Sequence, residues 1–155
     1  SSVTGVQTCA LPISLKWTPS LHTGYVDLGS GLLHRSGAKE RATNKRRPPC
    51  RIPAKLMPHL ERWRAADMRR GWADVCHWDG KASRSIKTSW ATAREAAGLG
   101  PEVTPHTLRH TCTTWLMQRG VPVAEVAGFV GLSIEMVDRV YGHHSPDHQK
   151  KAAGR

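Results

Sequence analysis

Two residues that follow Thr104 and Pro105, His106 and Arg109, could bind a phosphate and take part in chemistry on it. They stand three positions apart, so a helix would present an imidazole and a guanidinium on one face. A guanidinium pairs with phosphate oxygens through parallel hydrogen bonds, and an imidazole takes up or releases a proton near neutral pH. The pair indicates chemistry on a phosphate, although a surface or helix-capping pair would have the same spacing.

The same stretch makes a weaker case for a metal. His106 and His110 have the spacing of zinc ligands on a helix, but Thr107 stands where the helix of a zinc protease has a glutamate. The cysteines are far apart and form no C-x-x-C pair. They are Cys9, Cys50, Cys76 and Cys112. We therefore expect no metal site, no disulfide framework and a reducing, cytoplasmic environment.

Further motifs follow in a fixed order. The sequence reads P-H-T-L-R-H-T, then W-L-M-Q-R-G-V, then V-G-L-S, and Tyr141 lies nine residues after Leu132 and is followed by Gly142-His143. In this order and at this spacing, the motifs resemble the C-terminal catalytic domain of the tyrosine recombinases, or phage-type integrases. The resemblance extends more loosely upstream, through W-T-P-S-L-H-T-G-Y-V-D-L and K-R-R-P-P-C-R-I-P, and covers nearly everything after Ser14.

The resemblance implies an enzyme that cleaves and rejoins DNA. In this family a tyrosine attacks a phosphodiester and forms a 3′-phosphotyrosyl link, which frees a 5′-hydroxyl, and no metal or nucleotide cofactor is needed. Tyr141 matches the nucleophile, Arg109 the clamp on the phosphate oxygens, and His106 the general base or phosphate-positioning imidazole. The implied partners are double-stranded DNA and further copies of the chain assembled on it, with no membrane and no small-molecule substrate.

The family's general acid is a lysine in a hairpin turn, eight residues before a proline. Counting back from Pro53 gives Lys45, with Lys39 as the alternative. The segment from residue 35 to residue 55 holds eight basic residues against one acidic residue, Glu40, so we expect it to contact phosphates. The DNA-contacting residues that we predict are Lys39, Arg41, Arg46, Arg47 and His143.

The chain departs from the family pattern at two places. Many members carry a histidine where this chain has Leu132, which cannot donate to a phosphate. The family's other phosphate-binding arginine lies before the first strands, and residues 1–17 contain no arginine. Because each such donor is worth about 10² to 10³ in rate, we expect this chain to bind DNA without detectable turnover, as part of a parent protein that cleaves through Tyr141.

The surrounding sequence predicts the elements that position these residues. We expect a mainly helical α+β domain over residues 15–155, with a small three-stranded antiparallel sheet near the N-terminus, of the DNA breaking-rejoining type. We place Trp63, Trp90 and Trp115 in the core, because each lies on an apolar helical stripe. The predicted strands lie within 15–53 and 75–78, and the predicted helices are 53–71, 85–98, 104–120, 123–130 and 134–141.

Composition agrees with a nucleic-acid partner. The 155 residues carry 23 Lys and Arg against 12 Asp and Glu, a formal net charge of +11. No run reaches the roughly 18 apolar residues of a membrane-spanning helix. Residues 1–14 lack helical or strand periodicity, and residues 3–13 resemble the translation of a sequencing-library adapter, so we expect a non-native or disordered tail there.

One alternative from another functional class fits part of the sequence. Residues 121–141 read as a helix-turn-helix, with a glycine turn and Ser133 as the N-cap of a recognition helix. That second helix carries Glu135 and Asp138 against Arg139 alone, a poor surface for reading the major groove. A basic RNA-binding protein would account for the charge but not for the ordered motifs.

Overall fold

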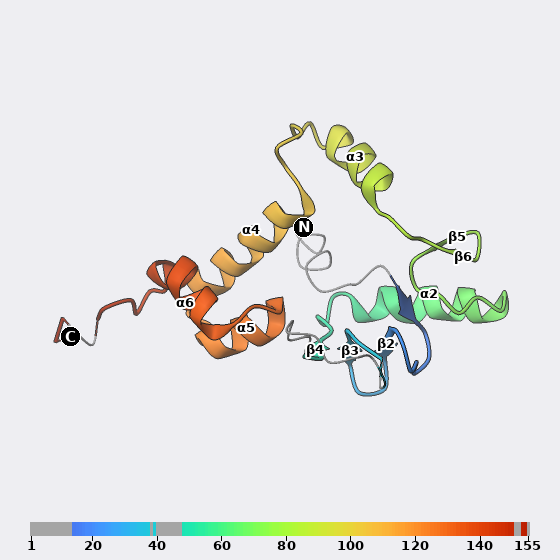
Figure 1. Ribbon diagram of the computed structural model, residues 1–155, viewed down its shortest axis with the longest axis horizontal. Helices are drawn as coiled ribbons and strands as arrows, with labels where there is room; N and C mark the ends of the chain where they lie inside the picture. The colour runs from blue at the N-terminus through green and yellow to red at the C-terminus, as the bar shows by residue number, and fades with distance from the viewer. Residues whose placement is uncertain (1–13, 38, 40–47, 151–152, 155) are drawn as a thin grey trace. The chain divides into compact units, whose positions relative to one another are not determined.

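The computed structural model describes residues 14–37, 39, 48–150 and 153–154 (Figure 1). The chain divides into two compact units, of which the first ends at Val103 and the second begins at Thr104. All but the last residue of the predicted N-terminal tail, and also Arg41, Lys45, Arg46 and Arg47, lie outside the described residues.

The first unit contains a sheet of four short strands in the order β1-β2-β3-β4. The strands are β1 (Leu15–Lys16), β2 (Gly24–Asp27), β3 (Leu32–His34) and β4 (Cys50–Arg51). The β2–β3 and β3–β4 pairs are antiparallel, whereas β1 runs parallel to β2. The α+β class with a small sheet is confirmed. The strand count differs from the predicted three, because strands of two residues are too short to show a period of two.

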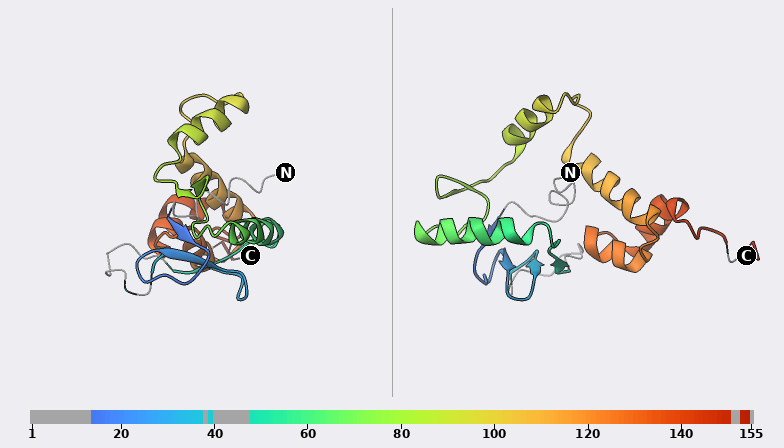
Figure 2. Two further views of the ribbon diagram at one scale, coloured as in Figure 1. Left: turned by 90° about the vertical axis from the view of Figure 1, so that its right-hand side faces the viewer. Right: turned by 180° about the vertical axis from the view of Figure 1, so that it is seen from behind.

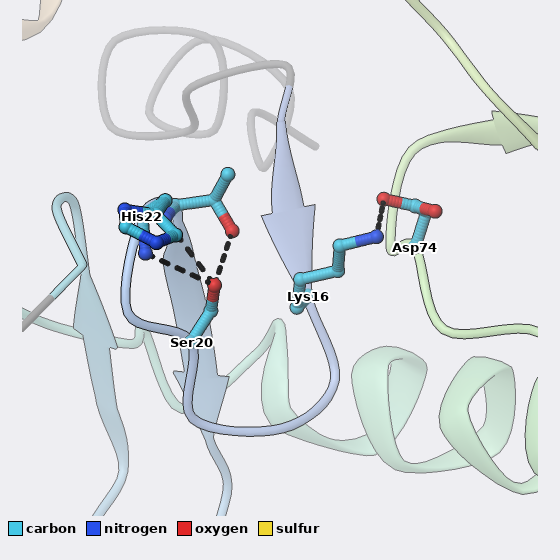
Figure 3. Close-up of polar contacts among 5 residues, drawn as sticks. Lys16, Ser20, His22 and Asp74 are labelled. Carbon is cyan, nitrogen blue, oxygen red and sulfur yellow. Dashed lines mark hydrogen bonds and ion pairs between the residues drawn. The ribbon is translucent and has the colours of Figure 1, made fainter.

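β1 is held to the rest of the first unit by both its side chains and its backbone. Figure 3 shows the Lys16 ammonium beside the Asp74 carboxylate, with Nζ and Oδ1 2.8 Å apart. The Val75 N–H donates to the Leu15 carbonyl at 2.9 Å. Figure 3 also shows the Ser20 hydroxyl, which accepts from the His22 backbone N–H at 3.4 Å in the turn that leads to β2.

α2 (Met57–Arg69) follows the sheet, and its buried face includes a carboxylate. Leu60 and Asp67 are buried on this face, two turns apart. Trp63 is 47% exposed, so the prediction that it anchors the core is wrong. The buried face of α2 carries Leu60 and Asp67 instead, so the apolar stripe does not coincide with the buried face.

Asp67 joins three segments of the first unit. Its Oδ2 accepts from the indole N–H of Trp17 at 2.8 Å and lies 3.2 Å from Nε2 of His77. The Nδ1 atom of His77 accepts from the Gly80 backbone N–H at 3.2 Å. His77 therefore carries its proton on Nε2, and the chain of hydrogen bonds runs from Gly80 through His77 to Asp67 and Trp17.

A hairpin and a helix complete the first unit. β5 (His77–Trp78) and β6 (Lys81–Ala82) are joined by Asp79 and Gly80, both at positive φ, as a two-residue hairpin turn requires. A Cβ on Gly80 would lie 2.6 Å from Nε1 of Trp72, so only glycine fits there. In α3 (Lys87–Ala96), partly buried Trp90 donates its indole N–H to the Val103 carbonyl at 3.1 Å.

The second unit is helical and follows the predicted boundaries closely. It consists of α4 (Pro105–Gln118), α5 (Val123–Val130), α6 (Ile134–Tyr141) and the 3₁₀ turn η1 (Gly142–His144). α5 and α6 pack against α4 and against each other, as Figure 2 shows from two sides. Gly131, at φ 73°, ends α5, and the Ser133 hydroxyl accepts from the Met136 N–H to begin α6.

The core of the second unit comes from all of these helices. Its buried members are Cys112, Met117, Val126, Ala127, Val130, Val137 and Tyr141. Trp115 is 46% exposed, so the prediction that it belongs to the core is also wrong, and Met117 supplies the buried bulk in that part of α4. No helix in the described ranges is both long and apolar enough to cross a membrane.

Candidate active site

The start of α4 is fixed by its cap, and the cap determines where the two histidines and the arginine lie. The Thr104 side chain accepts from the Thr107 N–H, and the Thr107 hydroxyl accepts from the Thr104 N–H at 3.1 Å. Such a reciprocal cap satisfies two backbone donors at once. His106 therefore lies in the first turn of α4, with Arg109 and His110 one turn later.

His106 and His110 lie on one face of α4 and touch. Their ring centroids are 4.4 Å apart and their planes are nearly perpendicular, at 85°. Both residues are exposed to solvent. The face predicted to handle phosphate thus presents two imidazoles in contact, rather than one.

Tyr141 is the last residue of α6, and its hydroxyl meets this face from the core side. The residue is 5% exposed and belongs to the core of the second unit. Its hydroxyl forms a hydrogen bond with Nδ1 of His110, and the two ring centroids are 5.7 Å apart. Val137, one turn earlier on α6, is fully buried and fixes the inward face of the helix.

His110 is the residue that the sequence analysis missed as a partner of Tyr141. The i, i+4 spacing from His106 is visible in the sequence, but that spacing is typical of zinc ligands and does not point to a tyrosine. The contact joins residues 31 positions apart, so local periodicity carried no sign of it.

Arg109 is partly buried, and its guanidinium remains available for an anion. Its backbone carbonyl accepts from the buried Thr113 hydroxyl at 2.8 Å. Among the residues that the structure describes, no side chain is hydrogen-bonded or ion-paired with its guanidinium. A guanidinium without a carboxylate partner keeps all of its donors for phosphate oxygens.

Two neighbouring positions differ in their surroundings. Leu132, which stands where many family members carry a histidine, is partly buried and packs against the core of the second unit. His143 lies in η1, is exposed, and has its ring 4.0 Å from that of His144. Leu132 thus contributes apolar packing, while His143 is open to a polyanion.

The basic segment of the first unit is described only in part. Lys39 is exposed, and its backbone N–H donates to the Leu21 carbonyl at 2.8 Å. Arg35 is only 8% exposed, because the alternation of β3 places it on the same side as buried Leu33. Arg35 is therefore the one described basic residue of the segment from residue 35 to residue 55 that is buried. The predicted general acid, Lys45, lies outside the described residues.

In the described part of the first unit, the side chains of Asp27 and Cys76 have shifted pKa values. Hydrogen bonds from Ser30, and then from the Gly29 backbone, hold the pKa of the exposed Asp27 carboxyl below its usual value. Burial, and to a lesser extent the nearby Asp74 carboxylate, raises the pKa of the Cys76 thiol.

Within the described ranges, no cluster of three or more His, Cys, Asp or Glu side chains could hold a metal ion.

Part of the chain matches a known protein family. Residues 76–148, somewhat less than half of the chain, match the phage integrase family. The resemblance to the tyrosine recombinases, or phage-type integrases, is confirmed over this part of the chain. The match covers α3 to α6 and therefore includes His106, Arg109, His110 and Tyr141.

The relatives are similar over the same part of the chain. The chain is 44% identical over 69 residues to the integrase of Salmonella phage P22, a match that covers 44% of this chain and 17% of that integrase. It is 35% identical over 66 residues to the tyrosine recombinase XerD of Corynebacterium glutamicum, a match that covers 41% of this chain and 22% of that recombinase. The chain thus matches less than a quarter of either relative.

The fold is that of a known recombinase. A crystal structure of XerA recombinase superposes with a TM-score of 0.58 and 20% sequence identity, covering 97% of this chain. This chain spans 52% of that structure. At this identity the similarity shows the fold alone.

Proposed function

We propose that the chain supplies the tyrosine and most of the phosphate-binding residues of a site-specific DNA recombinase, which cleaves and rejoins strands through a 3′-phosphotyrosyl intermediate. The observation that carries the proposal is that the Tyr141 hydroxyl contacts the same face of α4 that carries His106. This contact places the hydroxyl of the proposed nucleophile beside the helix face that carries the H-x-x-R motif.

Each proposed role follows from the charge that develops on the phosphate. Tyr141 attacks phosphorus, Arg109 neutralises the non-bridging oxygens, and His106 holds the phosphate or acts as a base. Lys45 then gives a proton to the departing 5′-oxygen. Fixed donors of this kind are each worth about 10² to 10³ in rate, and an arginine on a phosphoryl transition state is worth about 10³ to 10⁵.

DNA binding depends on fewer accurately placed side chains than cleavage does. The net charge of +11 acts over many residues, so the loss of one contact weakens binding only modestly. Cleavage depends on a few donors, and Leu132 supplies none. We therefore propose that double-stranded DNA binds to Lys39, Arg41, Arg46, Arg47 and His143, and that this chain binds DNA without detectable turnover.

The test uses a nicked suicide substrate, which traps covalent protein–DNA adducts on a denaturing gel. We would replace the matching segment of the phage P22 integrase with residues 76–148 of this chain and assay it on that integrase's DNA site. The hybrid is expected to form an adduct, and its Tyr141→Phe variant none, because only Tyr141 provides the nucleophile.

The outcomes separate the functional classes. A folded hybrid that binds DNA and forms no adduct would favour the non-catalytic helix-turn-helix alternative.

The complete 155-residue chain is assayed beside the hybrid. Tyr25→Phe is the matched control, because Tyr25 and Tyr141 are the two tyrosines of the sequence. We expect binding without adduct from the complete chain. An adduct that survives Tyr25→Phe and disappears with Tyr141→Phe would show that its missing donors are dispensable.

A further inference from the structure

The Tyr141 hydroxyl lies against an imidazole nitrogen of α4. Nδ1 of His110 forms a hydrogen bond with that hydroxyl, and the tyrosine ring is buried around it. A phenol attacks phosphorus well only when its proton leaves as the new bond forms, because the phenolate is the stronger nucleophile. The neighbour of the hydroxyl is therefore the group that decides how readily Tyr141 reacts.

We propose that His110 is the general base that takes the Tyr141 proton during strand cleavage. This inference rests on the proposed function. The proposed function leaves His106 either to hold the phosphate or to act as a base. Here the two roles go to different residues: His110 receives the proton, and His106 binds the phosphate. In this arrangement the ring of His106 contacts the ring of His110, and the ring of His110 contacts that of Tyr141.

The proton and electron balance is simple. The Tyr141 oxygen forms its bond to phosphorus, the bond from phosphorus to the 5′-oxygen breaks, and the Tyr141 proton moves to Nδ1 of His110. The 5′-oxygen takes its proton from the general acid proposed above. Rejoining reverses each step, so the protonated His110 returns its proton to the departing Tyr141 oxygen.

The surroundings of His110 suit this role. In its neutral form, the imidazole can accept at Nδ1 only if its proton is on Nε2. His110 is exposed, so the proton that it receives can pass to solvent between cleavage events. The perpendicular contact with His106 restricts the orientation of the His110 ring. The Tyr141 side chain belongs to the core of the second unit and is 5% exposed.

The experiment measures the nucleophilicity of Tyr141 without DNA, in the complete chain. A dialkyl fluorophosphate offers phosphorus with a fluoride leaving group, and intact and peptide mass spectrometry report labelling at Tyr141. The parent for all variants is Tyr25→Phe, which leaves Tyr141 as the sole tyrosine. His110→Asn is the decisive variant, because its amide can accept a hydrogen bond where Nδ1 lies but cannot take the proton. His148→Asn, an exposed histidine on the C-terminal segment, is the matched control.

We expect labelling of Tyr141 to slow about 10²-fold or more in His110→Asn and His110→Ala, and to be unchanged in His148→Asn. Equal rates in the parent and His110→Asn would overturn the proposal, because the hydrogen bond alone would then suffice. A parent in which Tyr141 is not labelled, while a free tyrosine derivative is, would overturn it as well. Circular dichroism confirms that each variant is folded.

The DNA assay distinguishes this failure from failure of the proposed function. In the integrase hybrid, His110→Asn should lower the rate of adduct formation at least as strongly as it lowers labelling. A hybrid that forms the adduct equally fast with and without His110 refutes the base and leaves the recombinase function intact. If the hybrid forms no adduct while labelling of the complete chain depends on His110, the recombinase function is refuted. The activation of Tyr141 by His110 is then still supported.

Discussion

Replacing Asp67 by alanine should destabilise the first unit more than any surface change. The Asp67 carboxylate, in a residue that is 6% exposed, accepts from the indole N–H of Trp17, which is 2% exposed. Without it, a buried donor loses its partner at a cost of about 1 to 3 kcal/mol, and the contact with His77 is lost as well. We expect a total loss of about 3 kcal/mol, a large share of the 5–15 kcal/mol typical of a domain.

Hydrogen exchange read by mass spectrometry on the peptide that covers β2 and β3 measures this loss directly. The matched control is Asp74→Ala, whose ion pair with Lys16 is partly exposed and should contribute less than about 1 kcal/mol. The double variant Trp17→Phe/Asp67→Ala should cost less than the sum of the two single changes, because it leaves no orphaned indole donor. A loss below about 1 kcal/mol in Asp67→Ala, or strict additivity, would refute the reasoning.

Three further predictions concern the rest of the chain. Ser133→Ala removes the cap of α6 and should destabilise the second unit by about 1 kcal/mol in calorimetry, whereas an unchanged melting temperature would contradict the capping role. The raised pKa of Cys76 means less thiolate at a given pH, so iodoacetamide should label it more slowly than a model thiol at pH 8. Asp74→Asn should speed that labelling, and a slower reaction would reverse the assigned cause. Affinity for duplex DNA should fall at least about 100-fold between about 50 and 200 mM salt, and a flat titration would argue against phosphate contacts.

The helices of the second unit could be predicted because their ends carry local signals. Thr104 and Ser133 begin α4 and α6 through side-chain bonds to nearby backbone, and Gly131 ends α5 at a positive φ. These interactions span three or four residues, so the sequence shows them directly. The same holds for the predicted phosphate-binding pair, since His106 and Arg109 share one turn of helix.

What could not be predicted depends on contacts between distant residues. Trp63 and Trp115 lie on apolar stripes, but which part of a stripe is buried depends on the partner segment, and both side chains are about half exposed. The pairing of β1 with β2 joins strands too short to show a pattern. The contact of His110 with Tyr141 depends on how α6 packs on α4, which no local spacing reveals.

The bond between Trp17 and Asp67 also affects the order in which the chain acquires structure. It closes a loop of 50 residues, and the backbone bond from Val75 to Leu15 closes a longer one. During synthesis, β1 must wait for Asp67 and Val75 to leave the ribosome before it gains these partners. The second unit needs no such wait, because α4, α5 and α6 pack on their neighbours in the sequence. Segments with short-range contacts fold faster than those with long loops. We therefore expect the unit that holds Tyr141 to form more quickly than the first unit, although it is made after it.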